Sequence, residues 1–370
     1  MVWFGSIRNQ TTVDLLITAA MEFMIYQRPL ITLEAMGMTY RFAAMTAPLA
    51  FVLAAGLFAT PAAAQSRSTA PKRWTTPRTP DGQPDLQGIW SNATITPFER
   101  PRELGGKEYF TEEEAAEYEK KVVEGANRDR RSSDPNADLG GAYNEFWFDR
   151  GTKVVPTQRT SLVVDPPDGR VPPLTPAAQK AAAARAAVTR RPPEGPEDLA
   201  PVVRCIVWPT SGPPMLPTAY NNNYQIVQGP GYVAILVEMI HDMRIIPLDG
   251  RPHLPANMRQ WMGDSRGRWD GDTLIVDTTN FSDKTSLRGS DKDLHLIERF
   301  TRASENTIMY QFTVDNPTAF TRAWKGEIPL TKASGPIYEY ACHEGNYSME
   351  GILKGARAQE KAAAEPKELK

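Results

Sequence analysis

The chain has 370 residues, with 42 Lys and Arg against 44 Asp and Glu and a formal net charge of −2. This length suits one large domain or two small ones. The balanced charge has no basic stripe and no polybasic patch, which argues against nucleic acid and anionic lipid as partners. The expected partner is therefore a small-molecule ligand, and the charge pattern leaves the oligomeric state open.

The N-terminal part of the chain has the layout of an export signal. Residues 38–41 are a short basic start, residues 42–58 are largely apolar, and small residues lead up to Ala64. We predict a signal peptide over 38–64, cleaved after Ala64, with residues 1–37 as a mis-assigned upstream extension. The alternative is a membrane anchor, but the apolar run is short and ends in a cleavage-like motif. The mature protein is expected in the periplasm or secreted, without insertion in the membrane.

The mature part is predicted to form a single domain. A leader over 65–78 is rich in Ser, Thr, Pro and Lys, and a tail over 362–370 is expected to be disordered. Between them, 79–361 forms the domain, with a Pro-rich excursion over 166–203 that contains an Ala-rich helix beginning at Pro176.

The second half of the domain has the pattern of a β-rich fold. Short alternating or apolar runs are separated by turns, of which Asp270-Gly271 is a strong two-residue hairpin signal. The predicted strands cover residues 220–228, 231–239, 242–248, 266–269, 272–281, 294–302, 307–314, 322–330 and 337–342. Helices are predicted over 111–125, after a capping box, and over 348–361. The expected fold is mainly β: an antiparallel meander that closes into a barrel.

A glycine and a tryptophan near the start of the domain add to this expectation. Gly88-Ile-Trp90 follows a turn and resembles the opening of lipocalin-like barrels, in which the tryptophan closes one end of the barrel.

Both cysteines of the chain, Cys205 and Cys342, lie in the mature part. Because an exported chain meets an oxidising compartment, we predict a disulfide between them. The alternative is a pair of buried free thiols. Two cysteines alone do not make a structural zinc site.

Two acidic side chains fall on otherwise apolar strand faces. Glu238 ends an apolar run, and Glu298 shares a face with Leu296 and Phe300. A buried carboxylate is costly unless it is paired or protonated, so both are candidates for a catalytic acid or base. The alternative is a structural ion pair with Arg244 or another interior arginine.

Three histidines are candidate proton partners of these acids. His241 and His253 flank a polar loop, and His343 follows the last predicted strand. Loops of a barrel can converge at one mouth, so the three imidazoles are predicted to meet there. The alternatives are unrelated structural histidines or a histidine-ligated metal. Because no HExxH, HxH or CxxC motif is present, no metal and no cofactor are predicted.

A further set of polar and aromatic side chains suits the binding of a ligand. Guanidinium groups bind carboxylates and stack on rings, and asparagines both donate and accept hydrogen bonds. The predicted ligand-binding residues are Tyr220, Asn222, Tyr224, Arg244, Trp261, Arg266, Arg268 and Trp269. The alternative is that Arg–Asp pairs rigidify the loop and that the asparagines satisfy their own backbone.

Several strings of residues point to a common family. They are YNNNY at 220–224, EMIHD at 238–242, WMGDSRGRW at 261–269, GDTLIVDTTNF at 271–281 and YEYACHEGNY at 338–347. Together they resemble an uncharacterised family of exported bacterial proteins. The resemblance covers most of the mature chain and implies export, but it implies no activity.

Three functions are compatible with these residues. The first is a metal-free acid/base enzyme, a lyase, isomerase or hydrolase acting on a small organic or aromatic compound. The second is a lipocalin-like carrier of an apolar ligand without catalysis. The third is a metalloenzyme with histidine ligands.

Overall fold

The computed structural model describes residues 74–364 apart from 141–143, 209–210 and 285–286. The described residues all belong to one compact unit that runs from Thr69 to Lys370. The described residues do not include the predicted upstream extension, the signal peptide, most of the leader or the end of the tail.

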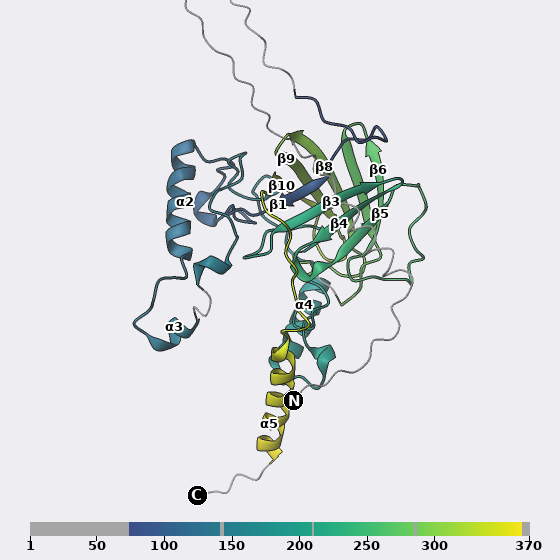
Figure 1. The fold of residues 1–370 in the computed structure, drawn as a ribbon. Helices are drawn as coiled ribbons and strands as arrows, with labels where there is room; N and C mark the ends of the chain where they lie inside the picture. The colour runs from purple at the N-terminus through teal and green to yellow at the C-terminus, as the bar shows by residue number, and fades with distance from the viewer. Residues whose placement is uncertain (1–73, 141–143, 209–210, 285–286, 365–370) are drawn as a thin grey trace, which may run out of the picture. The chain divides into compact units, whose positions relative to one another are not determined.

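Nine strands form an antiparallel sheet that curves around a common interior, which confirms the predicted β-barrel (Figure 1). Their order in the sheet is β5-β4-β3-β1-β10-β9-β8-β7-β6. The strands are β1 (Gly88–Ser91), β3 (Asn223–Gly229), β4 (Tyr232–Val237), β5 (Met243–Pro247), β6 (Asp264–Asp270), β7 (Thr273–Thr279), β8 (His295–Ser304), β9 (Thr307–Asp315) and β10 (Trp324–Lys332). A short strand, β2 (Val163–Asp165), pairs with β10 outside this order. Two hairpins join β6 to β7 and β8 to β9 at the predicted turns.

The barrel is nearly closed. Its two end strands, β5 and β6, lie next to each other without a backbone ladder between them. Side chains bridge this gap: Arg244 Nε on β5 donates to Ser265 Oγ on β6 at 3.0 Å. The last closure of the barrel therefore depends on side chains and not on strand pairing.

The helices begin where their capping residues predict. In α2 (Glu112–Ala126), Thr111 and Glu114 form a capping box, and α4 (Pro176–Arg190) starts with Thr175 as N-cap and a proline in the first turn. The C-terminal helix is α5 (Tyr347–Ala364), and a short α3 spans Pro135–Gly140. Single 3-10 turns are η1 (Arg102–Leu104), η2 (Glu145–Trp147), η3 (Pro196–Asp198) and η4 (Met239–His241). Among the described residues, none of the helices has the length and apolar character needed to cross a membrane.

The interior of the barrel is filled with side chains. Alternate residues of β8 and β9 point inward, among them Phe300, Tyr310 and Phe312, all at most 1% exposed. Near the start of β10, the ring of Trp324 meets the rings of Phe98, Phe312 and Phe320 edge to face. The centre of the barrel is therefore a packed core.

Trp90 closes the end of the barrel at which the β8–β9 hairpin turns. Its ring is fully buried, and its indole N–H donates to the carbonyl of Leu86 at 2.9 Å. The guanidinium of Arg302 lies 5.4 Å from the ring centroid and is held by the carbonyls of Asp85 and Glu305. The lipocalin-like resemblance of Gly88-Ile-Trp90 stays a prediction.

Two predicted strands differ from the structure. The run that ends in Glu238 stops as a strand at Val237, because Ile240 takes a left-handed backbone conformation (φ 61°) in the turn η4. Residues 337–342 form no strand; they follow β10 away from the sheet, toward the disulfide partner Cys205.

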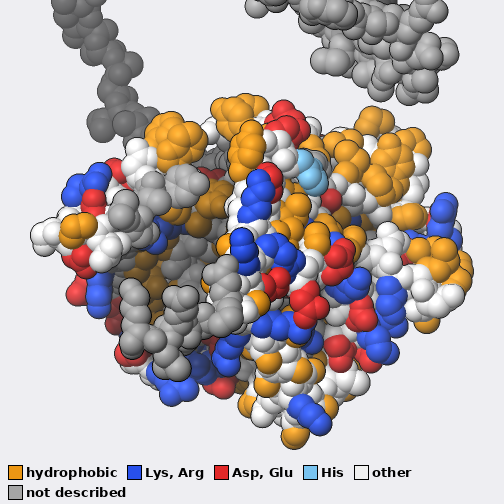
Figure 2. Space-filling model, turned by 90° about the horizontal axis from the view of Figure 1, so that it is seen from below, with side chains coloured by type: hydrophobic (Ala, Val, Ile, Leu, Met, Phe, Trp, Pro, Cys, Tyr) orange, Lys and Arg blue, Asp and Glu red, His pale blue; other side chains and the backbone are white. Residues whose placement is uncertain are grey.

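The charged side chains are mixed on the surface. The face in Figure 2 shows basic and acidic side chains interspersed with hydrophobic ones. This agrees with the balanced charge of the sequence.

Candidate functional site

A buried ion pair joins strands on both sides of the gap between β5 and β6. Arg244 on β5 and Glu298 on β8 are 6% and 0% exposed, and Arg244 Nη1 lies 3.0 Å from Glu298 Oε1. The second nitrogen, Nη2, bonds Glu298 Oε2 and donates to Thr278 Oγ1 at 3.1 Å. Desolvation of two charges is expensive, so such a pair persists only with this degree of hydrogen bonding. These contacts correspond to the structural ion pair considered as the alternative to catalysis by Glu298.

A fourth strand, β9, completes this network. The hydroxyl of Tyr310 on β9 donates to Glu298 Oε1 at 2.8 Å, and burial raises the pKa of Tyr310, with the negative charge of Glu298 adding to the effect. Tyr310 therefore stays a neutral donor. Its oxygen in turn accepts the backbone N–H of Met215 at 3.0 Å.

Met215 belongs to a segment that plugs the barrel. We define the plug as residues 211–216, of which Ser211, Met215 and Leu216 are at most 5% exposed. Gly212 has φ 108°, and a Cβ there would lie 2.9 Å from the Met215 side chain, so the glycine allows this tight turn. The plug fills the space that a ligand in the barrel interior would need.

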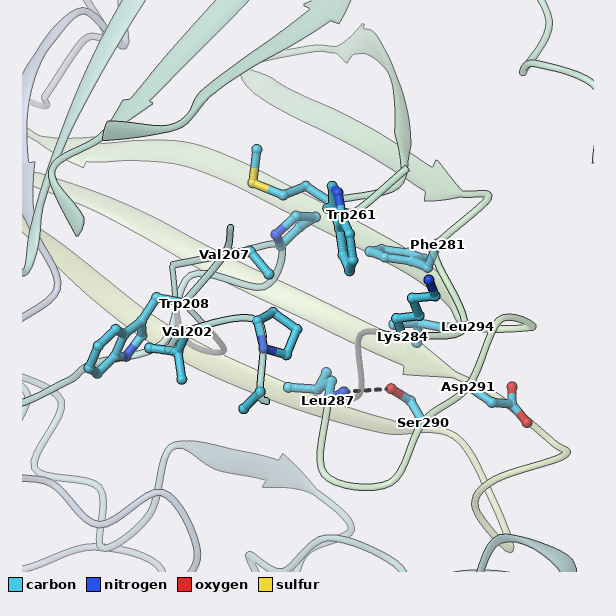
Figure 3. Close-up of a pocket in the computed structure, with 15 residues that line it drawn as sticks. Val202, Val207, Trp208, Trp261, Phe281, Lys284, Leu287, Ser290, Asp291 and Leu294 are labelled. Carbon is cyan, nitrogen blue, oxygen red and sulfur yellow. Dashed lines mark hydrogen bonds between the residues drawn. The ribbon is translucent and has the colours of Figure 1, made fainter. Parts of the chain in front are cut away.

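Beside the plug lies a cavity of about 220 Å³. Most of its lining is apolar: Val202, Val207, Trp208, Pro213, Trp261, Met262, Phe281, Leu287 and Leu294. Figure 3 shows Trp261 and Phe281 on one side of the cavity and Val202 and Trp208 on the other. A more polar hollow of about 500 Å³ follows the gap between β5 and β6 and shares Trp261 and Met262 with it. Trp261 thus stands between the two spaces.

Two charged residues lie at the cavity, and they differ in how they are held. The Asp291 carboxylate, which points away from the cavity in Figure 3, accepts hydrogen bonds from Asn316 at 2.9 Å and from Thr318 at 2.9 Å. Burial works against its charge, but these bonds prevail and hold the pKa of Asp291 below its ordinary value. The exposed Lys284 ammonium has no hydrogen bond or ion pair with any described residue. The cavity therefore offers one uncommitted positive charge.

Of these lining residues, only Trp261 was predicted from the sequence. Phe281, Lys284, Leu287 and Leu294 come from the connection between β7 and β8. The available signal was a set of apolar residues within an otherwise polar connection, which is unusual for a simple solvent-exposed loop.

The two candidate acids have separate hydrogen-bond partners. Glu238 is 2% exposed and accepts hydrogen bonds from Asn223 Nδ2 at 2.8 Å and from the backbone N–H of Tyr338 at 3.1 Å. Glu298 has a separate set of partners within the barrel. The catalytic roles of both acids stay predictions.

The histidines group differently from the expectation. His253 Nδ1 lies 3.0 Å from Asp264 Oδ2, and its Nε2 lies 3.1 Å from Asp277 Oδ1. The other oxygen of Asp277 lies 2.9 Å from His295 Nε2. These four side chains, hereafter the His–Asp cluster, lie on the outer face of β6, β7 and β8 and hold the loop of residues 249–263 against the barrel. Strand alternation placed His295 on this outer face, but only the register of β7 and β8 puts Asp277 beside it.

The other two candidate histidines, His241 and His343, come from other segments of the chain. The backbone of His241 is in the turn η4, but its side chain lies outside the described part of the structure. His343 is exposed in a turn directly after Cys342. Among the described residues, no group of His, Cys, Asp and Glu has the arrangement of a metal site.

The arginines and tryptophans of residues 259–269 do not form one clamp. Arg266 donates to Asp264 Oδ1 at 2.6 Å and to the carbonyl of Pro252, and Arg268 is exposed on the outer face of β6. Trp261 precedes β6, whereas Trp269 lies near its far end. The Arg–Asp pairing that rigidifies the loop is present; ligand binding by these arginines stays a prediction.

The asparagine-rich stretch supports the local fold. Asn222 is fully buried and bonds Asp149 and the carbonyl of Thr218. Tyr224 is also buried, which raises its pKa, and its hydroxyl accepts a hydrogen bond from Asn92 at 3.2 Å. Tyr220 is half-buried against Trp208 at 6.1 Å between ring centroids, so it lies close to the cavity lining.

The predicted disulfide is present. Cys205 and Cys342 are bonded, with 5.8 Å between their Cα atoms. Asn346 Nδ2 donates to the carbonyl of Val203 at 2.8 Å and strengthens the same junction. The disulfide therefore anchors the segment that leads to the plug.

Comparison of the chain with models of protein families, with curated proteins and with solved structures finds no match. The suggested kinship with exported bacterial proteins stays a prediction, and the site has to be interpreted from its own residues.

Proposed function

We propose that this protein binds a small organic acid with an apolar, ring-sized body, at the cavity beside the plug. The observation that carries the proposal is the combination of an apolar cavity, walled by Trp261 and Phe281, with the uncommitted ammonium of Lys284. Pockets with apolar walls and few polar groups are the usual form of small-molecule sites.

The size of the cavity limits the ligand. An apolar protein cavity of about 150 Å³ accepts benzene. A cavity of about 220 Å³ therefore fits one substituted aromatic ring or a short branched aliphatic chain. Burial of such a body contributes about 25 cal/mol per Å² of apolar surface removed from water.

The charge at the cavity selects the polar group of the ligand. Lys284 is available to a carboxylate, whereas Asp291 is already committed to Asn316 and Thr318. An exposed cation adds up to about 1 kcal/mol, which corresponds to roughly fivefold in affinity. An anionic ligand is therefore favoured over a neutral or cationic one of the same shape.

Acid/base catalysis is the second candidate, and the His–Asp cluster is the observation in its favour. An imidazole oriented by a carboxylate is the usual general base. Both nitrogens of His253 face carboxylates, however, so neither is left for a substrate in this arrangement. Binding without reaction therefore ranks first.

Export remains part of the proposal. The disulfide between Cys205 and Cys342 supports maturation in an oxidising compartment, as expected for a chain with a signal peptide over 38–64. The ligand would then be encountered outside the cytoplasm.

The test is ligand binding by the mature protein, measured by saturation-transfer NMR with benzoate, phenylacetate, benzyl alcohol and benzylamine. The two acids should bind more tightly than the alcohol and the amine. Lys284→Met should weaken the acids about fivefold and leave benzyl alcohol unchanged. Leu287→Trp should fill the cavity and abolish binding of all four compounds.

Ile352→Trp, at an exposed position of α5, is the matched control for Leu287→Trp and should bind like the wild type. The proposal fails if no compound binds, or if Leu287→Trp binds as well as the control. Turnover of a bound acid that is lost in His253→Ala would instead favour the enzyme.

A further inference from the structure

A second cavity, of about 660 Å³, lies at the opposite end of β6. Trp261 and Met262 directly precede β6 and line the first cavity, whereas Trp269 is near the end of the strand and lines the second. At about 3.3 Å per residue, the seven residues of β6 separate the two by roughly 20 Å. The second cavity is therefore independent of the proposed site.

Two aromatic rings form part of its wall. Tyr232 begins β4 and is 40% exposed. Its ring covers Gly229, where an added Cβ would lie 2.4 Å from the ring carbon Cζ. Because glycine lets one face of the ring rest on the backbone, the ring is held in place beside the cavity. Trp269 is half-buried and packs against the barrel core.

Trp269 carries an unusual polar group. Its Nε1 is buried and has no hydrogen-bond partner among the described residues. Buried donors in proteins are nearly always satisfied, by protein, by water or by a ligand. Because this nitrogen is buried, a ligand in the cavity meets the ring of Trp269 and not its N–H.

The rest of the wall is polar and carries little charge. Gln228 holds the segment of residues 79–87 in place, since it accepts from the N–H of Leu86 at 2.7 Å and donates to the carbonyl of Pro84 at 3.0 Å. The side chains of Asp81 and Gln83 have no partner among the described residues. No Lys or Arg is among the described residues that line the cavity. The wall therefore offers amide and carboxylate groups but no site for an anion.

From these contacts we infer that the second cavity binds a neutral carbohydrate of one or two sugar units. A sugar ring has an apolar C–H face that stacks on an aromatic ring, and hydroxyls that both donate and accept. Gln83 and Asp81 match these hydroxyls, and the rings of Tyr232 and Trp269 offer the apolar surface for the C–H face. The volume lies within the usual range for small-ligand sites, roughly 300 to 1,000 Å³.

The experiment is saturation-transfer NMR of the mature protein with glucose, galactose, mannose, maltose and cellobiose. Choline chloride and gluconate serve as a cationic and an anionic probe. At least one neutral sugar should bind, and choline and gluconate should not. Trp269→Phe replaces the indole by a smaller ring with less surface for stacking, and should weaken sugar binding about three- to tenfold.

A second variant and a control separate binding from folding. Gln83→Ala should also weaken sugar binding, whereas Gln359→Ala on the exposed face of α5 should not. Trp269→Phe removes a donor that has no partner, so its urea midpoint should match that of the wild type.

The inference is overturned if none of the five sugars binds, if choline or gluconate binds instead, or if sugar binding survives both Trp269→Phe and Gln83→Ala. Leu287→Trp, which fills the first cavity, should leave sugar binding unchanged. Failure at one cavity is thereby distinguished from failure at the other.

Discussion

The guanidinium of Arg244 on β5 meets the carboxylate of Glu298 on β8 inside the barrel, with 3.0 Å between Nη1 and Oε1. β5 has no ladder to β6, so this pair and the contact of Arg244 with Ser265 join the two ends of the sheet. The polar groups in the interior therefore close the barrel.

Removal of one partner of this pair should be strongly destabilising. Arg244→Met leaves Glu298 buried without its counter-charge, which should lower the free energy of unfolding by about 3 to 5 kcal/mol. Urea unfolding, monitored by tryptophan fluorescence, measures this change in the free energy of unfolding. Arg268→Met, an exposed arginine on the adjacent strand, should change the stability by less than about 0.5 kcal/mol. Equal effects of the two substitutions would show that the pair does not close the barrel.

The plug should depend on the hydroxyl of Tyr310. Tyr310→Phe leaves the N–H of Met215 without its acceptor and removes one of two hydrogen bonds to Glu298 Oε1, the bond from Arg244 remaining. This should cost about 1 to 3 kcal/mol. Amide hydrogen exchange at Met215 should accelerate more than exchange in β7. Tyr338→Phe, at a tyrosine that is 68% exposed, is the control and should leave both quantities unchanged. Slow exchange at Met215 in Tyr310→Phe would mean that packing alone holds the plug.

The disulfide should stabilise the mature protein substantially. Cys205 and Cys342 are 137 residues apart, and a bond that closes so long a loop restricts the unfolded chain. Replacement of both by serine should lower the free energy of unfolding by about 2 to 4 kcal/mol. Dithiothreitol should destabilise the wild type to a similar extent and have no effect on the double variant. A wild type that is insensitive to reduction would argue against a stabilising bond.

The His–Asp cluster should make stability depend on pH. The hydrogen bond to Asp277 raises the pKa of His295 above 6.5, despite partial burial, so its contribution is complete below that pH and is lost as the pH rises through the raised value. The same bond lowers the pKa of Asp277 below 3.8, so its contribution is present above 3.8 and is lost in stronger acid. The stabilisation is therefore greatest between pH 3.8 and 6.5.

His295→Gln measures this contribution. Because both side chains are partly exposed, it should cost about 0.5 to 1 kcal/mol at pH 5.5 and less at pH 8.5, by urea unfolding. In an Asp277→Asn background, the same substitution should have an effect that changes much less with pH, because only the charge of Asp315 then raises the pKa of His295. A cost in the wild-type background that grows toward high pH would contradict the assignment.

Local chemistry made much of the fold predictable. The capping box at Thr111, the proline at the start of α4 and the Asp270-Gly271 turn act within a few residues, so their structures follow from their own sequence. Alternation assigned Glu298 inward and His295 outward, since successive side chains of a strand point to opposite faces. The expected export and the presence of two cysteines were enough to predict the disulfide.

The candidate site was less predictable because it depends on the closure of the barrel and on the register between strands that are distant in sequence. Arg244, Glu298 and Tyr310 come from three strands, and their contact needs the whole barrel. His253 joins His295 through Asp277, because the register of β7 and β8 sets the distance between Asp277 and His295.

The sequence alone determined most of the strands, their apolar faces and the pairing of the cysteines. Periodicity and composition carry this information. Only the tertiary structure decided that the interior is plugged, and that Trp261 and Trp269 lie at opposite ends of β6, each at its own cavity. The reason is geometric: a strand extends by about 3.3 Å per residue, so side chains that are close in sequence come to lie far apart along the barrel.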